Sequence, residues 1–185
     1  MEEVEPPGSD TDVFVDRWNG TAWEPLGGGL RGTAERGAFP RLAITPGGQT
    51  FLSFVRFSWT ATVLTVLEWS DDSATWFDRG SLRTSSDATV RLGTLASDPA
   101  GRPVALWQER LVVDGETTHW YHVHRRGTAG WTALGTPLVA SCAVYVSGLA
   151  VAPDGTPIIA IQQRADVGGG ASRLHLHTYR LNSAP

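Results

Sequence analysis

A seven-residue pattern, Leu-Ala-x-x-Pro-x-Gly, occurs three times in this chain. The copies begin at Leu42, Leu95 and Leu149, so they lie 53 and 54 residues apart. Each copy reads as the end of a short strand followed by a tight turn, because Pro presets φ at about −65° and Gly accepts a positive φ. A repeat of this length with strands and turns inside it is typical of a β-propeller blade.

The expected strands recur with the same period. Apolar runs rich in β-branched and aromatic residues follow each copy, and they fit strands that stacked blades would cover on both faces. No stretch keeps a helical apolar period, so the sequence predicts an all-β chain without helices. Residues 30–39 are expected to be a connection. The expected strands are residues 13–18, 21–26, 41–45, 49–57, 62–69, 75–79, 90–97, 103–110, 117–125, 130–134, 146–152, 157–164 and 172–181.

The strand order divides the chain into an acidic tail and successive blades. We expect the tail, residues 1–11, to be disordered because it is rich in acidic residues and Pro. The rest is predicted to be a β-propeller segment of about three to three and a half four-stranded blades, whereas closed propellers have about four or more. Such a segment is an open arc, a part of a longer protein, or one portion of a ring that identical chains complete. The blades are a partial blade at 12–39, two blades at 40–89 and 90–145, and an incomplete blade at 146–181.

Composition excludes several classes of function. The net charge of −4 gives no reason to expect nucleic acid, which needs a basic face. The single Cys rules out an internal disulfide and a cysteine-based metal cluster. No stretch approaches the roughly 20 apolar residues of a membrane helix, and the acidic start of the chain is unlike a secretory signal. Localisation is therefore open: cytoplasmic for the chain taken literally, and extracytoplasmic if it is part of a longer surface protein.

Two stretches of the chain carry a family resemblance. Residues 17–27 contain Trp-Asn-Gly-Thr-Ala-Trp-Glu-Pro-Leu-Gly, and residues 95–109 run from Leu-Ala-Ser-Asp-Pro to Leu-Trp-Gln-Glu. They resemble the repeat of kelch-like and sialidase-like (BNR-type) surface β-propellers of GC-rich bacteria, and the resemblance extends over residues 12–181. Residues 70–76 are similar to the Asp-box hairpin of sialidase-type propellers, one residue short and without its Gly. The resemblance implies a propeller fold and an extracytoplasmic place, and it implies little about activity.

Tryptophans fall into two groups. One group recurs in each repeat, which favours a packing role, because a core position must recur and a binding site need not. Trp59 and Trp120 lie outside the repeat, near the expected connections between the second and third strands of a blade, and are candidates for contact with a ligand. The recurring group consists of Trp18, Trp23, Trp69, Trp76 and Trp131.

Arginines near the ends of the second strands suggest an anion site. Arg110 and Arg164 are equivalent positions 54 residues apart, Arg56 is one position off, and Glu109 lies beside Arg110. These four residues are candidates for contact with a ligand. A guanidinium group presents a planar fork to carboxylates. Sialidases use such an arginine cluster, yet the Tyr nucleophile and the Asp acid of those enzymes find no counterpart here. Arginines that are solvated or locally paired are the simpler interpretation.

Two pairs of histidines, His122 with His124 and His175 with His177, each place two imidazoles on one face of a strand. At the repeat spacing His122 aligns with Leu176, so the pairs are expected to face opposite ways. We therefore expect no metal site and no cofactor.

Taken together, the sequence favours a non-catalytic binding or interaction module, with a carbohydrate or protein ligand on the rim or between blades. No catalytic residue is assigned. Two alternatives stay open: a fragment of a sialidase-like glycoside hydrolase, and a purely structural cell-surface repeat. Homo-oligomers that complete the propeller are a further expectation.

Overall fold

Every regular element in the computed structural model is a β-strand within the part of the chain that it describes, so the all-β prediction is confirmed. None of the described segments forms a helix long and apolar enough to cross a membrane. The predicted acidic tail lies outside the described residues. These are residues 12–30, 36–113, 115–140, 144–166 and 172–181.

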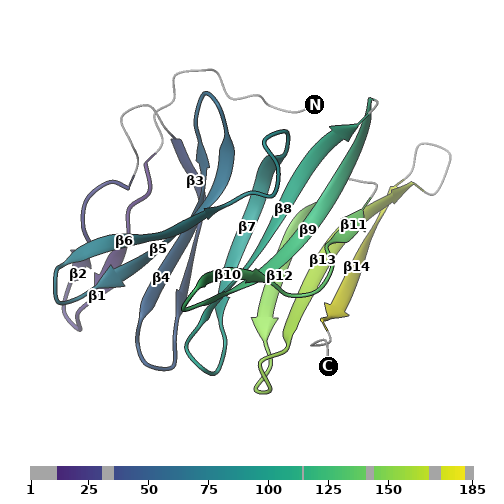
Figure 1. Ribbon diagram of the computed structural model, residues 1–185. Helices are drawn as coiled ribbons and strands as arrows, with labels where there is room; N and C mark the ends of the chain where they lie inside the picture. Colours follow the sequence, from purple (N-terminus) through teal and green to yellow (C-terminus); the bar gives the residue numbers. More distant parts are fainter. Residues whose placement is uncertain (1–11, 31–35, 114, 141–143, 167–171, 182–185) are drawn as a thin grey trace.

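The strands form four antiparallel sheets that follow one another along the chain (Figure 1). We call them sheets I to IV. Sheet I contains β1 (Asp16–Trp18) and β2 (Trp23–Pro25); sheet II contains β3 (Arg36–Ile44), β4 (Thr50–Phe57), β5 (Thr62–Ser70) and β6 (Thr75–Leu82); sheet III contains β7 (Thr89–Ser97), β8 (Pro103–Val113), β9 (Glu116–Gly127), β10 (Gly130–Ala133) and β11 (Leu138–Ala140); sheet IV contains β12 (Val144–Val151), β13 (Pro157–Asp166) and β14 (Ser172–Arg180).

The inner strand of each of the last three sheets lies next to the inner strand of its neighbour, since β7 contacts both β3 and β12. Figure 1 shows the hairpins β3–β4, β7–β8 and β12–β13 together at its lower edge. We call this the hairpin end of the molecule. The opposite end, where β3, β7 and β12 begin, is the entry end.

The repeated Leu-Ala-x-x-Pro-x-Gly pattern forms the turns of the hairpin end. Its last residue has a positive φ in all three copies, 84° at Gly48, 77° at Gly101 and 82° at Gly155. The amide of that Gly donates to the carbonyl three residues earlier, at 2.8–2.9 Å. A side chain would strain this backbone conformation, which explains why the motif ends in Gly. The predicted turn is confirmed.

Apolar side chains fill the space between each pair of neighbouring sheets. Burying one such side chain stabilises the fold by about 1.5–3 kcal/mol, so stacking of successive sheets supplies most of the hydrophobic core. The buried clusters are, between sheets I and II, Val13, Val15, Leu26, Leu52, Phe54 and Trp69; between II and III, Ala43, Phe51, Val55, Leu64, Val66, Leu82, Val90, Leu95, Ala105 and Trp107; and between III and IV, Val104, Leu106, Tyr121, Val123, Ala140, Ile159 and Ile161.

A tryptophan on β6 and another on β10 link their sheets to the preceding one. Trp76 Nε1 donates to the carbonyl of Leu26 at 2.7 Å, and Trp131 Nε1 donates to the carbonyl of Arg79 at 2.8 Å. The residue after each acceptor is a Gly whose added Cβ would come within 3.3 Å of the indole ring. Packing is therefore the role of Trp76 and Trp131, as it is for Trp69, which is 5% exposed. Trp18 and Trp23, for which the same role was predicted, are instead exposed.

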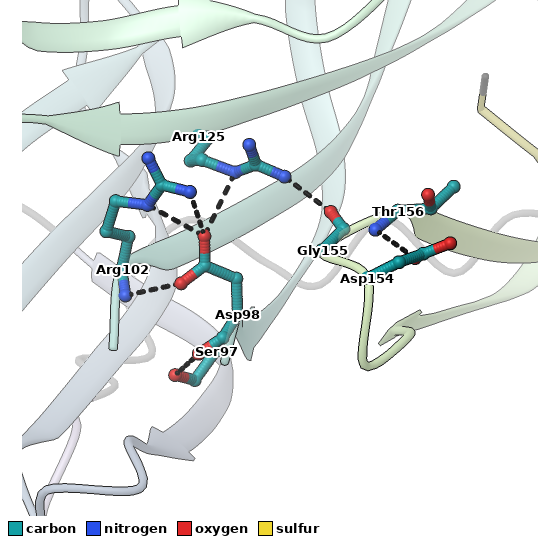
Figure 2. Close-up of polar contacts among 7 residues, drawn as sticks. All are labelled: Ser97, Asp98, Arg102, Arg125, Asp154, Gly155 and Thr156. Carbon is teal, nitrogen blue, oxygen red and sulfur yellow. Dashed lines mark hydrogen bonds and ion pairs between the residues drawn. The ribbon is translucent and has the colours of Figure 1, made fainter. Parts of the chain in front are cut away.

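Charged groups join sheets III and IV at the hairpin end (Figure 2). The buried carboxylate of Asp98 accepts hydrogen bonds from the backbone amide and the Nε of Arg102, both at 2.8 Å, and lies 3.2 Å from Arg125 Nε. Arg125 Nη2 in turn donates to the carbonyl of Gly155, in the β12–β13 hairpin, at 2.5 Å. Asp98 thus holds the guanidinium that bridges the two sheets.

Several strand boundaries differ from the predicted ones, and two of the differences add pairing to the sheets. β3 begins at Arg36, inside the stretch 30–39 that was expected to be only a connection. β11 was not predicted; its three residues pair with β9 from Tyr121 to His119. The first residues of β3 and the whole of β11 pair with neighbouring strands, and this pairing depends on those neighbours rather than on local sequence.

Ala74 occupies the position at which the Asp-box-like hairpin β5–β6 lacks its Gly. Its φ is +48°, a left-handed conformation that costs a residue with a Cβ about 1 kcal/mol. We expect Ala74→Gly to raise the free energy of unfolding by up to about 1 kcal/mol, measured by urea denaturation. Ala61→Gly, in a turn where no positive φ occurs, is the control and is expected to lower it.

Candidate functional site

The residues singled out from the sequence all come from strands or connections at the entry end. Arg56 lies near the end of β4, Glu109 and Arg110 lie in the second half of β8, and Trp120 lies opposite Glu109 on β9. Trp59 lies in the connection between β4 and β5. Arg164 holds the position on β13 that Arg110 holds on β8, and its side chain lies outside the described part of the structure.

Trp59 lies in a tight turn that exposes its side chain to solvent. The amide of Ser58 donates to the carbonyl of Ala61 at 2.8 Å, and the Ser58 hydroxyl accepts from the Ala61 amide at 3.1 Å. These bonds fix the turn that carries Trp59, whose side chain is 89% exposed. An indole that large gains nothing from exposure to water, so the turn presents an aromatic surface that is available to a ligand.

The Arg110 guanidinium lies at the same end. It is half-buried, and it forms no ion pair or hydrogen bond with any residue that the structure describes. Beside it His119 is buried, and its Nδ1 lies 3.1 Å from Gln108 Nε2. Burial, and then the charges of Arg110 and Arg91, hold the pKa of His119 below its ordinary value. Two guanidinium groups therefore lie close to His119 at this corner of sheet III.

The arginines predicted to cluster do not share one face. Arg56 lies on the face of sheet II that packs against sheet I, with Phe54, whereas Arg110 lies on the face of sheet III toward sheet IV, with Leu106. Arg56 also lies within 3.4 Å of the Ser81 hydroxyl. Arg56 is one position away from the repeat equivalent of Arg110, and successive residues of a strand point to opposite faces. The two side chains therefore lie on different faces of their sheets.

Trp120 is half-buried and lies on the same face of β9 as His122, paired with Glu109 on one side and Val139 on the other. It therefore faces sheet II, away from Arg110. Its partial exposure leaves it available at the edge of the entry end.

Glu109 is fully buried between sheets II and III. Its carboxylate accepts hydrogen bonds from the Thr84 amide at 2.7 Å, from the Thr84 hydroxyl, and from Trp107 Nε1 at 2.9 Å, and His122 Nε2 lies 3.3 Å away. Burial opposes ionisation of this carboxyl, but bonds from His122, Thr84 and Trp107 outweigh it and lower the pKa of Glu109 to about 2. Glu109 therefore anchors the connection between β6 and β7 beneath the entry end.

Each inner strand slips register close to the entry end, a feature without a sequence signal. The shifts lie between Ala38 and Arg41, Val90 and Leu92, and Val144 and Ser147. The shift in β3 includes Phe39, which is 44% exposed and has a φ of +57°, and the shift in β7 includes Arg91. Bulges re-aim side chains next to binding sites, and a strained, exposed aromatic at such a place is a sign of function.

A pocket of about 370 Å³ opens at the hairpin end of sheet II. Its charges are largely paired: Glu68 Oε2 lies 2.5 Å from Arg79 Nε, and Asp71 binds Arg17 at 2.7 Å. The Arg79 guanidinium lies 5.6 Å from the centre of the half-exposed Phe77 ring. We call this the hairpin-end pocket; it is lined by Gly47, Gly48, Gln49, Glu68, Trp69, Ser70, Asp71, Asp72, Phe77 and Arg79.

Over the described part of the chain, no three His, Cys, Asp or Glu side chains are arranged to hold a metal ion. His122 and His124 instead pack on the buried Trp107 ring, at centroid distances of 5.1 and 4.6 Å. Burial, followed by the nearby His122, lowers the pKa of His124. The side chain of His175 lies outside the described residues.

No protein-family model and no curated protein matches this chain. Solved structures do match it. A GH93 α-L-arabinofuranosidase of Fusarium graminearum, solved with arabinobiose, is 12% identical; the match covers 95% of this chain and 60% of that one, with a TM-score of 0.54. An endo-arabinase from Bacteroides thetaiotaomicron is 14% identical over 88% of this chain and 62% of its own, with a TM-score of 0.51.

The likeness shows the fold. Both proteins are five-bladed β-propellers, so this chain is a β-propeller segment, as predicted. It spans about three-fifths of the length of each. The matches give no support to a kelch-like or sialidase-like family in particular.

Proposed function

We propose that this chain is a carbohydrate-binding propeller module whose ligand contacts the entry end. The exposed Trp59 carries the proposal, because a sugar ring needs a flat apolar face and the hydrogen-bonded turn presents this indole to solvent. Arg110, which has no ion-pair or hydrogen-bond partner among the described residues, supplies a hydrogen-bond donor for a hydroxyl or carboxylate of the ligand. The contact would extend to Trp120, Phe39 and Arg91. Its margins would include Arg56 and Arg164, and the buried Glu109 would support the site from below. Both fold neighbours have names that refer to arabinose-containing carbohydrates.

Hydrolysis is the second candidate function, because both fold neighbours are glycoside hydrolases. It requires two carboxyl groups about 5–10 Å apart on either side of the glycosidic bond. The inner strands β3, β7 and β12 contain no Asp or Glu. Glu109 is buried and ionised, so it can neither donate a proton nor reach a substrate as a nucleophile. Binding without catalysis therefore has more support than hydrolysis. Release of a fluorophore from aryl arabinofuranosides would indicate hydrolysis, and release from aryl sialosides would indicate a sialidase-like hydrolase.

Trp59→Ala is expected to raise the dissociation constant for a glycan hit by about tenfold or more, a loss of about 1.4 kcal/mol or more. The hit would come from a glycan array that includes arabino-oligosaccharides and acidic glycans, and titration calorimetry would measure the affinity. The thermal midpoint should not change, since the indole packs on nothing. Phe77→Ala, in the hairpin-end pocket, is the matched control and should bind normally. Loss of binding in Phe77→Ala but not in Trp59→Ala would contradict an entry-end site, and a purely structural repeat would bind no glycan at all.

A further inference from the structure

Two side chains that lie opposite each other on β8 and β9 are placed to bind one group together. Arg110 pairs with His119 across these strands, so both side chains lie on the same face of sheet III, with Cβ atoms roughly 5 Å apart. Leu106 and Tyr121 lie on this face too, and they pack toward sheet IV. The β8–β9 hairpin reaches the entry end, at the upper edge of Figure 1. We call the two residues the Arg110–His119 pair.

The His119 ring is held in one orientation by its neighbours. The residue is 8% exposed, and Gln108 Nε2, which donates to the Tyr121 hydroxyl at 2.8 Å, lies 3.1 Å from His119 Nδ1. Because an amide nitrogen only donates, Nδ1 accepts and the imidazole proton lies on Nε2. Burial and the charges of Arg110 and Arg91 lower the pKa of His119, so the ring is neutral at neutral pH. It offers one N–H donor, and within the described part of the chain nothing accepts from it.

Arg110 supplies the second donor. Its side chain is half-buried, yet no residue that the structure describes accepts from it. Arg17 and Arg180 are more exposed, with 51% and 58% of their side chains accessible, and each nevertheless binds an aspartate. The carboxylate of Glu109, the next residue along the strand, lies on the opposite face and accepts hydrogen bonds from other residues. A half-buried cation without an acceptor is unfavourable, so an acceptor from outside the chain fits here.

A carboxylate is the group that best fits these donors. One of its oxygens can accept from the guanidinium fork while the other accepts from the imidazole N–H, and hydrogen bonds to an ionised acceptor are stronger than those to a neutral one. The two charges that act on His119 are both positive, which favours an anion beside it. A sugar hydroxyl would fill the same place with weaker bonds and would leave the guanidinium charge without a counterion.

We propose that the glycan bound at the entry end is acidic, and that Arg110 and His119 bind the carboxylate of one of its uronic acid residues. This inference rests on the proposed function, since it names the class of glycan that the same site would take. Trp59, on sheet II, would stack on another sugar ring of the same chain. Because the two contacts lie on different sheets, the ligand is an oligosaccharide rather than a single sugar.

Matched pairs of oligosaccharides test the proposal on the whole chain. The probes are oligomers of glucuronate and of galacturonate, each compared with its methyl ester, which keeps the sugar and removes the charge. Titration calorimetry should give a dissociation constant at least tenfold lower for one or both acids than for the ester, and the difference should shrink at high salt. Equal affinity for acid and ester, both weakened by Trp59→Ala, would overturn this proposal and leave the proposed function standing. Absence of binding to any glycan would overturn both.

Substitution of Arg110 shows whether the carboxylate lies where we propose. Arg110→Gln should weaken binding of the acid at least tenfold and leave binding of the ester nearly unchanged, whereas Arg110→Lys should keep part of the preference. Arg180→Gln, which removes the same charge at the hairpin end, is the matched control and should bind like the wild-type chain.

A measurement on the wild-type chain does not depend on the folding of any variant. In NMR spectra the ring resonances of His119 should shift when the acid is added and stay in place when the ester is added. Resonances of His119 that do not respond to the acid, or an acid preference that Arg110→Gln leaves intact, would overturn the proposal.

Discussion

Replacing Glu109 by Gln should lower the free energy of unfolding by about 2–4 kcal/mol and the thermal midpoint by roughly 5–15 °C. The amide keeps the shape of the side chain but replaces one acceptor oxygen with a donor. Donors from Thr84 and Trp107 that now share the carboxylate would lose a partner inside a closed space. Thermal unfolding followed by tryptophan fluorescence measures the change, because Trp107 lies in the affected joint. Glu116→Gln, at an exposed strand end, is the control and should stay within about 0.5 kcal/mol.

The same carboxylate predicts how stability depends on pH. The pKa of Glu109 is about 2 in the folded chain, below the value of about 4.3 for an unfolded glutamate. Its contribution is therefore present above pH of about 4.3 and lost as the pH falls toward 2. Wild-type stability should fall more steeply than that of Glu109→Gln across this interval. Equal slopes for the two proteins would mean that Glu109 is not held ionised by its neighbours.

The repeat made the fold predictable because its signals are local. The Gly that ends each Leu-Ala-x-x-Pro-x-Gly copy is required by a positive φ, and the apolar run after it is required by sheets on both sides. Such requirements recur in every blade, so one chain supplies several independent instances of the same pattern. The recurring Trp76 and Trp131 are explained in the same way, by a contact with the preceding sheet.

Features that depend on distant partners were not predictable. Glu109 was predicted to be a ligand contact. Its carboxylate instead accepts a hydrogen bond from Thr84, 25 residues away in the connection between β6 and β7. The strain at Phe39 arises from a register shift between β3 and β4, which leaves no local pattern. Trp18 and Trp23 are exposed because no described sheet packs on their face of sheet I. The repeat predicts that these positions pack against a neighbouring sheet, but it does not show whether that sheet is present.

Asp98→Ala should lower the free energy of unfolding by about 2–4 kcal/mol, measured by urea denaturation. The carboxylate is buried, and hydrogen bonds from Arg102 together with the charges of Arg102 and Arg125 outweigh burial and lower its pKa. Without it the backbone amide of Arg102 has no acceptor, and Arg125 loses the group that aims it at the carbonyl of Gly155. Asp154→Ala is the matched control: its ion pair with Arg180 is more than half exposed on both sides, so its loss should change the free energy of unfolding far less than Asp98→Ala does.

A double-mutant cycle with Arg125→Met decides whether Asp98 acts through the bridge between sheets III and IV. Coupling of about 1–3 kcal/mol is expected, because Arg125→Met should cost much less once Asp98 is gone. Hydrogen exchange gives an independent measure: the β12–β13 amides should exchange faster in Asp98→Ala, while those of β4 and β5 in sheet II keep their protection. Additive effects, or loosening spread evenly over all sheets, would instead assign Asp98 to the folding of its own turn.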